Sequence, residues 1–512
     1  MHDIDKKSRR PSLFGRALNQ IEGLGNRLPD PIFLFVWMCA ATAIGSWIVA
    51  SMGASVVHPV TGKTIYAVNL LTPENLRRML VEAVPNFLQF PPLGVVLVIM
   101  LGVGVAEKSG WIEGLIRGFV LSVPRGWMTA GIVFAGVCSS VAADAGFVVL
   151  IPLGGAIFAS VGRHPLAGMF AAFAGVSGAF EANVFPAPID AILAGLTQAA
   201  ARLYETGYVV NPLCNYYFMA ISAVALTATG WWVTEKIIEP RLGQWEPEEG
   251  VSAPETLREP EPRERKANRW ALACLGLFTI VVAALVVPPD AFLRDQKGGV
   301  KPFFDAFPII LAAGFLIPGI IYGKLTGSLP NGRAVRVAIT ESIGSMSGFM
   351  VLAFVAAQFI SYFSWSNLGV MLALSGAEKL HSVGATGISL VIGIVLMSTV
   401  LNLFITSASA MWAAVAAVFA PMFMHLGLSP ELTQAAFRIG ESVTNCCTPL
   451  MSYFPLILIF AQRWVPRVGI GTILSSMLPY SVLFTVVWTS LLIVWYLVGL
   501  PLGPGGSLFF SR

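Results

Sequence analysis

The sequence carries little charge for its length. Only 12% of its 512 residues are Asp, Glu, Lys or Arg, whereas a soluble domain has about 25%. Apolar residues make up 56% of the chain. A helix that spans a hydrocarbon core of roughly 30 Å needs about 20 apolar residues. Runs of this kind occur at 31–52, 213–235, 270–288, 304–322 and 472–499. The composition excludes an ordinary soluble enzyme and predicts an all-α polytopic membrane protein.

Residues that would indicate a metal centre or a covalent catalyst are also scarce. The six Cys have no CxxC spacing, and the five His have no metal-ligand spacing, so we expect free, buried thiols and no metal beyond a possible sodium ion. No Gly-rich phosphate loop followed by Lys is present, which argues against ATP hydrolysis. We expect no enzymatic activity, no organic cofactor and no nucleic-acid partner.

Charge also predicts the topology. Lys and Arg are concentrated before the first apolar run and in a polar stretch rich in Glu, Arg and Pro. The positive-inside rule places both in the cytoplasm of a bacterial cell, with the chain crossing the inner membrane several times. The predicted divisions are a cytoplasmic tail (1–30), a first transmembrane half (31–234), a cytoplasmic linker (235–269), a second transmembrane half (270–500) and a periplasmic tail (501–512).

Two apolar stretches are interrupted by polar residues. The stretch 126–160 contains Ser139, Ser140 and Asp144, and the stretch 386–425 is interrupted at 406–410. An even number of crossings must precede a cytoplasmic linker. We therefore interpret both stretches as re-entrant hairpins, which leaves nine transmembrane helices and places the hairpins on opposite membrane faces.

A helix broken near its middle follows each hairpin. Pro165 and Pro430 are each followed by Gly ten residues later and by Ser twelve residues later. The polar stretches 177–186 and 442–449 come next. Because unpaired backbone groups are costly in lipid, unwound backbone persists there only where it lines a polar cavity or an ion. Paired broken helices in an inverted repeat are typical of a transporter site near the midplane. The alternative is a pair of proline kinks patched by Ser and Thr hydroxyls.

Ionisable side chains within the predicted spans are candidates for function, because a charge at the bilayer centre costs at least about 2.5 kcal/mol. Arg438 could hold an anionic substrate with two hydrogen bonds, or pair with Glu441 one turn away. Glu181 and Asp190 lie on the first broken helix, where Asp190 could instead be solvated at the outer end. Trp412, beside the second hairpin tip, could stack on an aromatic substrate or face lipid.

Three asparagines lie at or beside the predicted unwound backbone. Asn183 follows Glu181 in the first break, Asn402 lies in the second hairpin, and Asn445 lies in the second break. Their neutral oxygens are ligands that a sodium ion prefers. We therefore expect Na⁺ or H⁺ as the coupling ion, with Asn402, Asn445 and Glu441 as the ion-binding residues. Asn183 and Glu181 are also expected among the substrate-binding residues.

The sequence resembles the AbgT family (p-aminobenzoyl-glutamate transporter and antimetabolite efflux family). The strings that carry the resemblance are LGVGVAEKSG at 101–110, SSVAADAG at 139–146, HPLAG at 164–168, SASA at 407–410 and SPELTQ at 429–434. The resemblance implies a homodimer that moves p-aminobenzoyl-glutamate or exports sulfonamide antimetabolites. It also implies nine helices and two opposed hairpins, in agreement with the charge pattern.

Carried over residue by residue, the resemblance assigns Asp190, Trp412, Pro430 and Arg438 to the substrate pathway and Asn402 to a sodium site. The sequence departs from the family pattern at three positions, with Glu181 in place of Ser, Met411 in place of Lys and Glu441 in place of Asp. The first two add a negative charge and remove a positive one.

Two other functions fit parts of the pattern. A cation-coupled dicarboxylate carrier would share the hairpin design and bind succinate-like acids. An intramembrane enzyme would need a catalytic pair, for which Asp144 and Asp190 are candidates without a supporting motif. The direction of transport cannot be predicted, because inverted repeats serve uptake and export alike.

Overall fold

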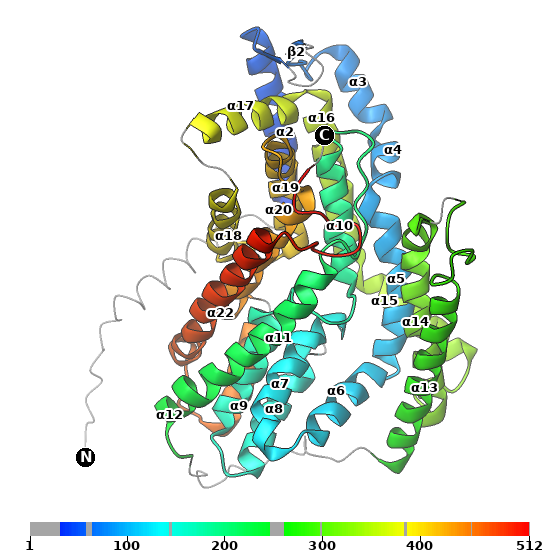
Figure 1. Ribbon diagram of the computed structural model, residues 1–512, viewed down its shortest axis with the longest axis vertical. Coiled ribbons are helices and arrows are strands. Elements are labelled where there is room, and N and C mark those ends of the chain that lie inside the picture. Colours follow the sequence, from blue (N-terminus) through cyan, green and yellow to red (C-terminus); the bar gives the residue numbers. More distant parts are fainter. Residues whose placement is uncertain are drawn as a thin grey trace, which may run out of the picture.

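The computed structural model describes residues 31–57, 64–142, 146–245, 261–296, 299–382, 384, 387–451 and 453–510. The predicted N-terminal tail, residues 246–260 of the predicted linker and Asp144 at the predicted first hairpin tip lie outside these ranges. The described chain is mostly helical, and many of its helices run along the long axis of the molecule (Figure 1).

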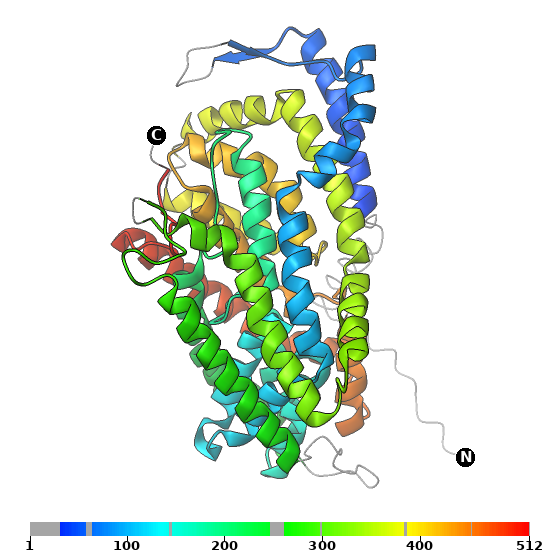
Figure 2. The same cartoon turned by 90° about the vertical axis from the view of Figure 1, so that its right-hand side faces the viewer.

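Seven helices in the described ranges are long and apolar enough to cross a membrane, and the pair α5 and α6, bent by 60°, makes up to eight. The seven are α2 (Pro31–Ser51), α11 (Tyr216–Val233) with its continuations η5 (Thr234–Ile238) and α12 (Glu239–Leu242), α13 (Pro262–Ala284), α14 (Lys301–Thr326), α16 (Ser347–Trp365), α19 (Ala408–His425) and α22 (Ile470–Val498). The bent pair is α5 (Pro91–Lys108) and α6 (Trp111–Ser122). The count of nine crossings stays a prediction. Figure 2 shows α13, α14 and α5 side by side along one face.

Several boundaries differ from the predicted ones. The chain between 332 and 365 is divided at Met346 into α15 (Gly332–Ser345) and α16, because Gly and Ser flank that residue and are poor helix formers. The predicted linker is partly helical, since α11 continues to Leu242 and α13 begins at Pro262. Elements outside the spans, the interrupted stretches and the broken helices are β1 (Ser55–Val57), β2 (Thr64–Tyr66), α3 (Pro73–Val81), α4 (Ala83–Leu88), η1 (Arg125–Trp127) and α17 (Leu368–Ser382).

The first interrupted stretch begins and ends at the same end of the molecule. It consists of α7 (Met128–Val137), η2 (Cys138–Ala142), η3 (Gly146–Leu150) and α8 (Ile151–Ser160). At its start, Thr129 Oγ1 accepts a hydrogen bond of 2.9 Å from Arg163, which follows α8. Arg163 also pairs with Glu239 of α12, and Thr129 donates to Glu235. Both ends of this stretch therefore lie at the linker end of α11.

The second interrupted stretch begins and ends at the opposite end. It consists of α18 (Ile388–Asn402) and α19, separated by 403–407. Gly387, before α18, lies against the Tyr496 hydroxyl near the end of α22. His425, at the end of α19, lies 3.2 Å from the Tyr204 hydroxyl, and the Tyr204 ring packs on Phe510. Figure 1 places α7, α8 and α12 away from the C-terminus and α17 near it. This arrangement is the one that an inverted repeat predicts, and re-entry at the membrane stays a prediction.

Both predicted broken helices are present. The first consists of α9 (Pro165–Phe173), η4 (Ala174–Gly178) and, after an unwound segment, α10 (Pro188–Ala201). The second consists of α20 (Pro430–Val443), η7 (Asn445–Cys447) and α21 (Phe454–Trp464). Pro occupies the first helical turn of α9 and α20, where its missing N–H costs nothing.

The glycines at matching positions of the two broken helices have the same role. A Cβ atom on Gly175 would lie 2.5 Å from the Val133 carbonyl of α7, and one on Gly440 would lie 2.3 Å from the Val395 carbonyl of α18. In each half the absent side chain lets the broken helix approach the first arm of its own hairpin. The repeat predicted from sequence spacing is thus also a repeat of packing.

The C-terminal residues, predicted as a tail, are packed against the protein. The Ser429 N–H donates to the Leu508 carbonyl at 3.0 Å, and the Phe510 N–H donates to the Gly427 carbonyl at 2.9 Å. Asn211, before α11, donates to the Pro504 carbonyl. This segment therefore connects the start of α20 in the second half to the loop before α11 in the first.

Candidate functional site

The two breaks meet in the interior of the protein. The backbone N–H of Glu181, in the first break, donates to Ser442 Oγ at 3.2 Å. The backbone carbonyl of Glu181 accepts a hydrogen bond of 2.9 Å from Arg438 Nη2. Ser442 Oγ in turn lies 2.9 Å from the Arg438 carbonyl on its own helix. Unwound backbone of the first half is thus satisfied by side chains of the second, as expected for backbone that lies away from water.

Arg438 lies between two carboxylates of the first half. Its Nε is 2.9 Å from Glu181 Oε2, and its Nη2 donates to Asp190 Oδ1 at 2.6 Å. The guanidinium is only 2% exposed. The prediction that Glu441 would be its partner was wrong, because the side chain leaves α20 toward the first break instead of following the helix. Arg438 is the only buried Lys or Arg in the described part of the chain.

Asp190 fills the start of α10. Its Oδ2 accepts a hydrogen bond of 2.7 Å from the Ala187 N–H and one of 3.4 Å from Asn183 Nδ2, while its Oδ1 pairs with Arg438. The N-terminus of a helix attracts anions, and at α10 this position is already occupied by the protein's own carboxylate. Asp190 is buried, so the alternative of a solvated side chain at the outer helix end was wrong.

The predicted ion-binding residues form a second group next to the first. Asn445 Nδ2 donates to Glu441 Oε1 at 3.2 Å, and Asn402 Nδ2 donates to Asn445 Oδ1 at 2.9 Å and to Thr444 Oγ1 at 3.0 Å. Asn402 is fully buried and its Oδ1 has no hydrogen-bond partner. Ser442 Oγ lies 3.3 Å from Glu441 Oε2 and connects the two groups. Sequence reasoning did not assign a role to Thr444, whose only signal was its position beside Asn445.

The buried charges do not balance. Glu181, Asp190 and Glu441 supply three carboxylates, and Arg438 supplies the one guanidinium among them. Ionised groups are costly to bury without compensation. The cluster as a whole is therefore suited to take up protons or a cation. Among the described residues, no set of three or more His, Cys, Asp or Glu side chains is arranged to hold a metal ion, so oxygens of neutral groups would have to contribute.

Trp412 and Pro430 support the site through packing. Trp412 is fully buried, donates from Nε1 to Thr197 Oγ1 at 2.8 Å and packs on Phe437 at a centroid distance of 4.5 Å. The suggestion that it faces lipid was wrong, and its ring faces Phe437 rather than open space. Pro430 begins α20 behind the Ser429 N-cap. Met411, where the resemblance expects Lys, is buried in α19 and adds no charge.

Sequence reasoning missed a further buried carboxylate. Glu431 lies in the first turn of α20. The Tyr208 hydroxyl donates to its carboxylate, with oxygen–oxygen distances of 3.1 Å to Oε1 and 2.9 Å to Oε2. Tyr208 lies in the loop between α10 and α11. Its pKa is raised above the usual value, mainly by burial and then by the neighbouring Glu431 charge. Glu431 belongs to the SPELTQ string at 429–434, which entered the sequence-based prediction only as part of the resemblance to the AbgT family.

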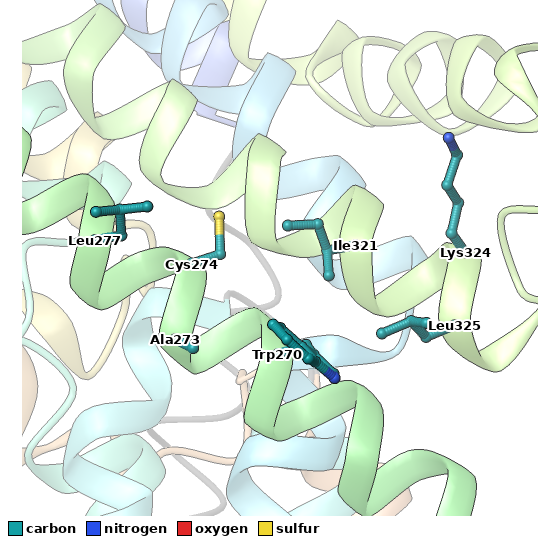
Figure 3. A pocket seen from close by; sticks show the side chains of 7 residues that line it. All are labelled: Trp270, Ala273, Cys274, Leu277, Ile321, Lys324 and Leu325. Carbon is teal, nitrogen blue, oxygen red and sulfur yellow. The ribbon is translucent and has the colours of Figure 1, made fainter.

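A cavity of about 460 Å³ lies elsewhere, between α13 and α14. Figure 3 shows Trp270, Cys274 and Leu277 of α13 facing Ile321 and Leu325 of α14, with the Lys324 amine extending away from them. Its lining is apolar and includes none of the predicted site residues. All six cysteines are free, as predicted, but burial was predicted correctly only for Cys214, Cys446 and Cys447, since the other three are partly exposed.

The comparison with known families decides what the broken helices and the buried cluster belong to. The model of the AbgT putative transporter family matches residues 16–510. The chain belongs to the AbgT family. Its relatives are transport proteins, and it is a multi-pass membrane transporter, not an enzyme.

Similar proteins support the family assignment over nearly the whole chain. The p-aminobenzoyl-glutamate transport protein of Escherichia coli (strain K12) is 36% identical over 508 residues, which cover 99% of this chain and 98% of that one. The YdaH transporter of Alcanivorax borkumensis has a TM-score of 0.88 at 41% identity, covering 93% of this chain and all of that one. MtrF of Neisseria gonorrhoeae, from a class of antimetabolite efflux pumps, has a TM-score of 0.90 at 43% identity, covering 96% and 100%.

Proposed function

We propose that the protein is a secondary active transporter of p-aminobenzoyl-glutamate or of related aromatic antimetabolites such as sulfonamides, driven by a cation gradient. The kinship with a p-aminobenzoyl-glutamate transport protein and with an antimetabolite efflux pump supports this substrate class. In this proposal the protein is a homodimer in the bacterial inner membrane. Each protomer has nine transmembrane helices and two opposed re-entrant hairpins.

The observation that carries the proposal is the ion cluster between the two halves. Arg438 belongs to α20 of the second half, while Glu181 and Asp190 belong to the break and to α10 of the first. Alternating access requires one repeat to move against the other around a central site. Each of these ion pairs crosses that boundary, so a ligand that replaces a carboxylate on Arg438 changes how firmly the halves are joined.

The residues have distinct proposed roles. Arg438 donates to a carboxylate of an anionic substrate, as a guanidinium does to planar anions. Asp190 accepts hydrogen bonds from the amino group of the substrate. Asn183 can both donate to and accept from the substrate's amide group. Trp412 and Pro430 fix the positions of α19 and α20 around them.

The cation is Na⁺ or H⁺, and the excess of carboxylates over guanidinium supports either. Sodium is favoured by the Asn402 carbonyl oxygen, which is buried without a partner close to Asn445 and Glu441. A hard cation takes neutral and anionic oxygens as ligands. Protonation of a carboxylate would relieve the same imbalance without occupying Asn402.

Purified protein in proteoliposomes tests the proposal. Flux of p-aminobenzoyl-glutamate and of sulfanilamide is measured with a sodium gradient alone, with a proton gradient alone and with neither, using succinate as a competitor. We expect gradient-dependent flux of at least one aromatic substrate that succinate does not inhibit. Inhibition by succinate without aromatic flux would support a dicarboxylate carrier instead, and a complete absence of flux would reject the proposal.

A further inference from the structure

Arg438 is the single partner of the Glu181 carboxylate. This carboxylate is fully buried, its Oε2 lies 2.9 Å from Arg438 Nε, and no other donor of the described residues contacts either of its oxygens. Asp190, the other carboxylate on Arg438, also accepts from the Ala187 N–H and from Asn183. Because every lost hydrogen bond adds to the cost of removing a buried group, Glu181 is the carboxylate of the two that can leave.

The Glu181 side chain can move while its backbone stays in place. The backbone N–H is held by Ser442 and the backbone carbonyl by Arg438, so the position of residue 181 does not depend on its carboxylate. The carboxylate of Asp190 pairs with the same guanidinium and therefore repels the Glu181 carboxylate. A carboxylate held by one ion pair and repelled by a neighbour is suited to exchange with another anion.

We infer that Glu181 is an internal competitor for substrate carboxylates: it occupies Arg438 in the empty transporter and must leave before an anionic substrate can bind there. The inference rests on the proposed function and specifies its substrate class. A dianion such as p-aminobenzoyl-glutamate has to displace Glu181 and enters a cluster that already holds three carboxylates. A neutral aromatic amine such as sulfanilamide binds beside the pair without displacing it and is therefore preferred.

The expected size of the effect follows from the occupancy of Arg438. When a site is open in only a fraction of the molecules, the apparent affinity falls by that fraction. If Glu181 covers Arg438 in about nine molecules of ten, its removal strengthens binding of the dianion about tenfold, which corresponds to about 1.4 kcal/mol. The affinity for sulfanilamide should change by less than about threefold, because that ligand never competes with Glu181.

Equilibrium binding of the two ligands to the purified full-length protein tests the inference. Glu181→Gln removes the charge and keeps the size, whereas Glu181→Asp keeps the charge. We expect Glu181→Gln to strengthen p-aminobenzoyl-glutamate binding about tenfold, with sulfanilamide binding nearly unchanged, and Glu181→Asp to retain the preference of the wild type. Glu431→Gln is the matched control, because it removes a buried carboxylate of α20 that pairs with Tyr208 and not with Arg438.

The outcomes separate this inference from the proposed function. If both ligands bind and Glu181→Gln leaves their affinity ratio unchanged, or Glu431→Gln shifts it equally, Glu181 is not a competitor and only the inference fails. If wild type and all variants bind neither ligand, the proposed function fails and the inference falls with it. Should Glu181→Gln not fold, Glu181→Ser provides the same removal of charge, and elution as a single species in gel filtration identifies usable protein.

Discussion

Replacing Gly440 by Ala would test the packing that unites each broken helix with its hairpin. The new Cβ would lie 2.3 Å from the Val395 carbonyl oxygen and 2.6 Å from Ser398 Cβ. The first atom is backbone and cannot rotate away, so α18 and α20 would have to separate by about 1 Å to restore ordinary contact. Overpacking of this kind costs about 1–3 kcal/mol, and a backbone neighbour places this substitution at the upper end. We expect a lower thermal unfolding midpoint in detergent and strongly reduced transport.

A Gly→Ala change on the neighbouring helix α18 provides the control. Gly393 is exposed, and a Cβ there meets no atom within 4 Å. Gly393→Ala should leave transport intact and can add up to about 1 kcal/mol of helix stability. Gly175→Ala, the counterpart of Gly440→Ala in the first half, should behave like Gly440→Ala. Equal unfolding midpoints and equal fluxes for Gly440→Ala and Gly393→Ala would refute the argument that close approach requires glycine at this position.

Two further predictions concern the coupling ion and the topology. Asn402→Ala should raise the sodium concentration needed for half-maximal flux, because it removes an unpaired buried oxygen, and unchanged flux across a sodium series with a proton gradient sufficient alone would contradict this. In a background without native cysteines, single cysteines at Trp127 and Ser160, around the first hairpin, should react with an impermeant reagent from one membrane face. Cysteines at Ser382 and Leu426, around the second, should react from the other face. Labelling of all four from the same face would disprove the inverted repeat.

The breaks in the helices could be predicted because their signals are local. Pro165 and Pro430 begin helices, and polar residues follow at matching offsets in each half. A helical period and a helix-starting proline can each be recognised within a few residues of sequence. The interruptions of the two stretches 126–160 and 386–425 could be predicted for the same reason, since polar residues interrupt otherwise apolar sequence.

The partners of Arg438 could not be predicted in this way. The residue pairs with Glu181, 257 positions away, whereas the helix spacing rule pointed to Glu441 three positions away. Which carboxylate pairs with Arg438 depends on how the two halves pack against each other. No local sequence pattern encodes this packing. The position of Trp412 was missed for a similar reason, because its Thr197 partner lies on a helix of the other half.

Flux through Arg438→Lys in proteoliposomes tests whether substrate crosses the membrane at the cluster around Arg438. Lysine keeps the positive charge but lacks the planar set of donors that contacts Glu181 and Asp190 simultaneously. We expect this variant to fold, with a gel-filtration profile like that of the wild type, and to transport neither p-aminobenzoyl-glutamate nor sulfanilamide. Wild-type flux of the aromatic substrate through Arg438→Lys would contradict the claim that substrate crosses the membrane at this cluster.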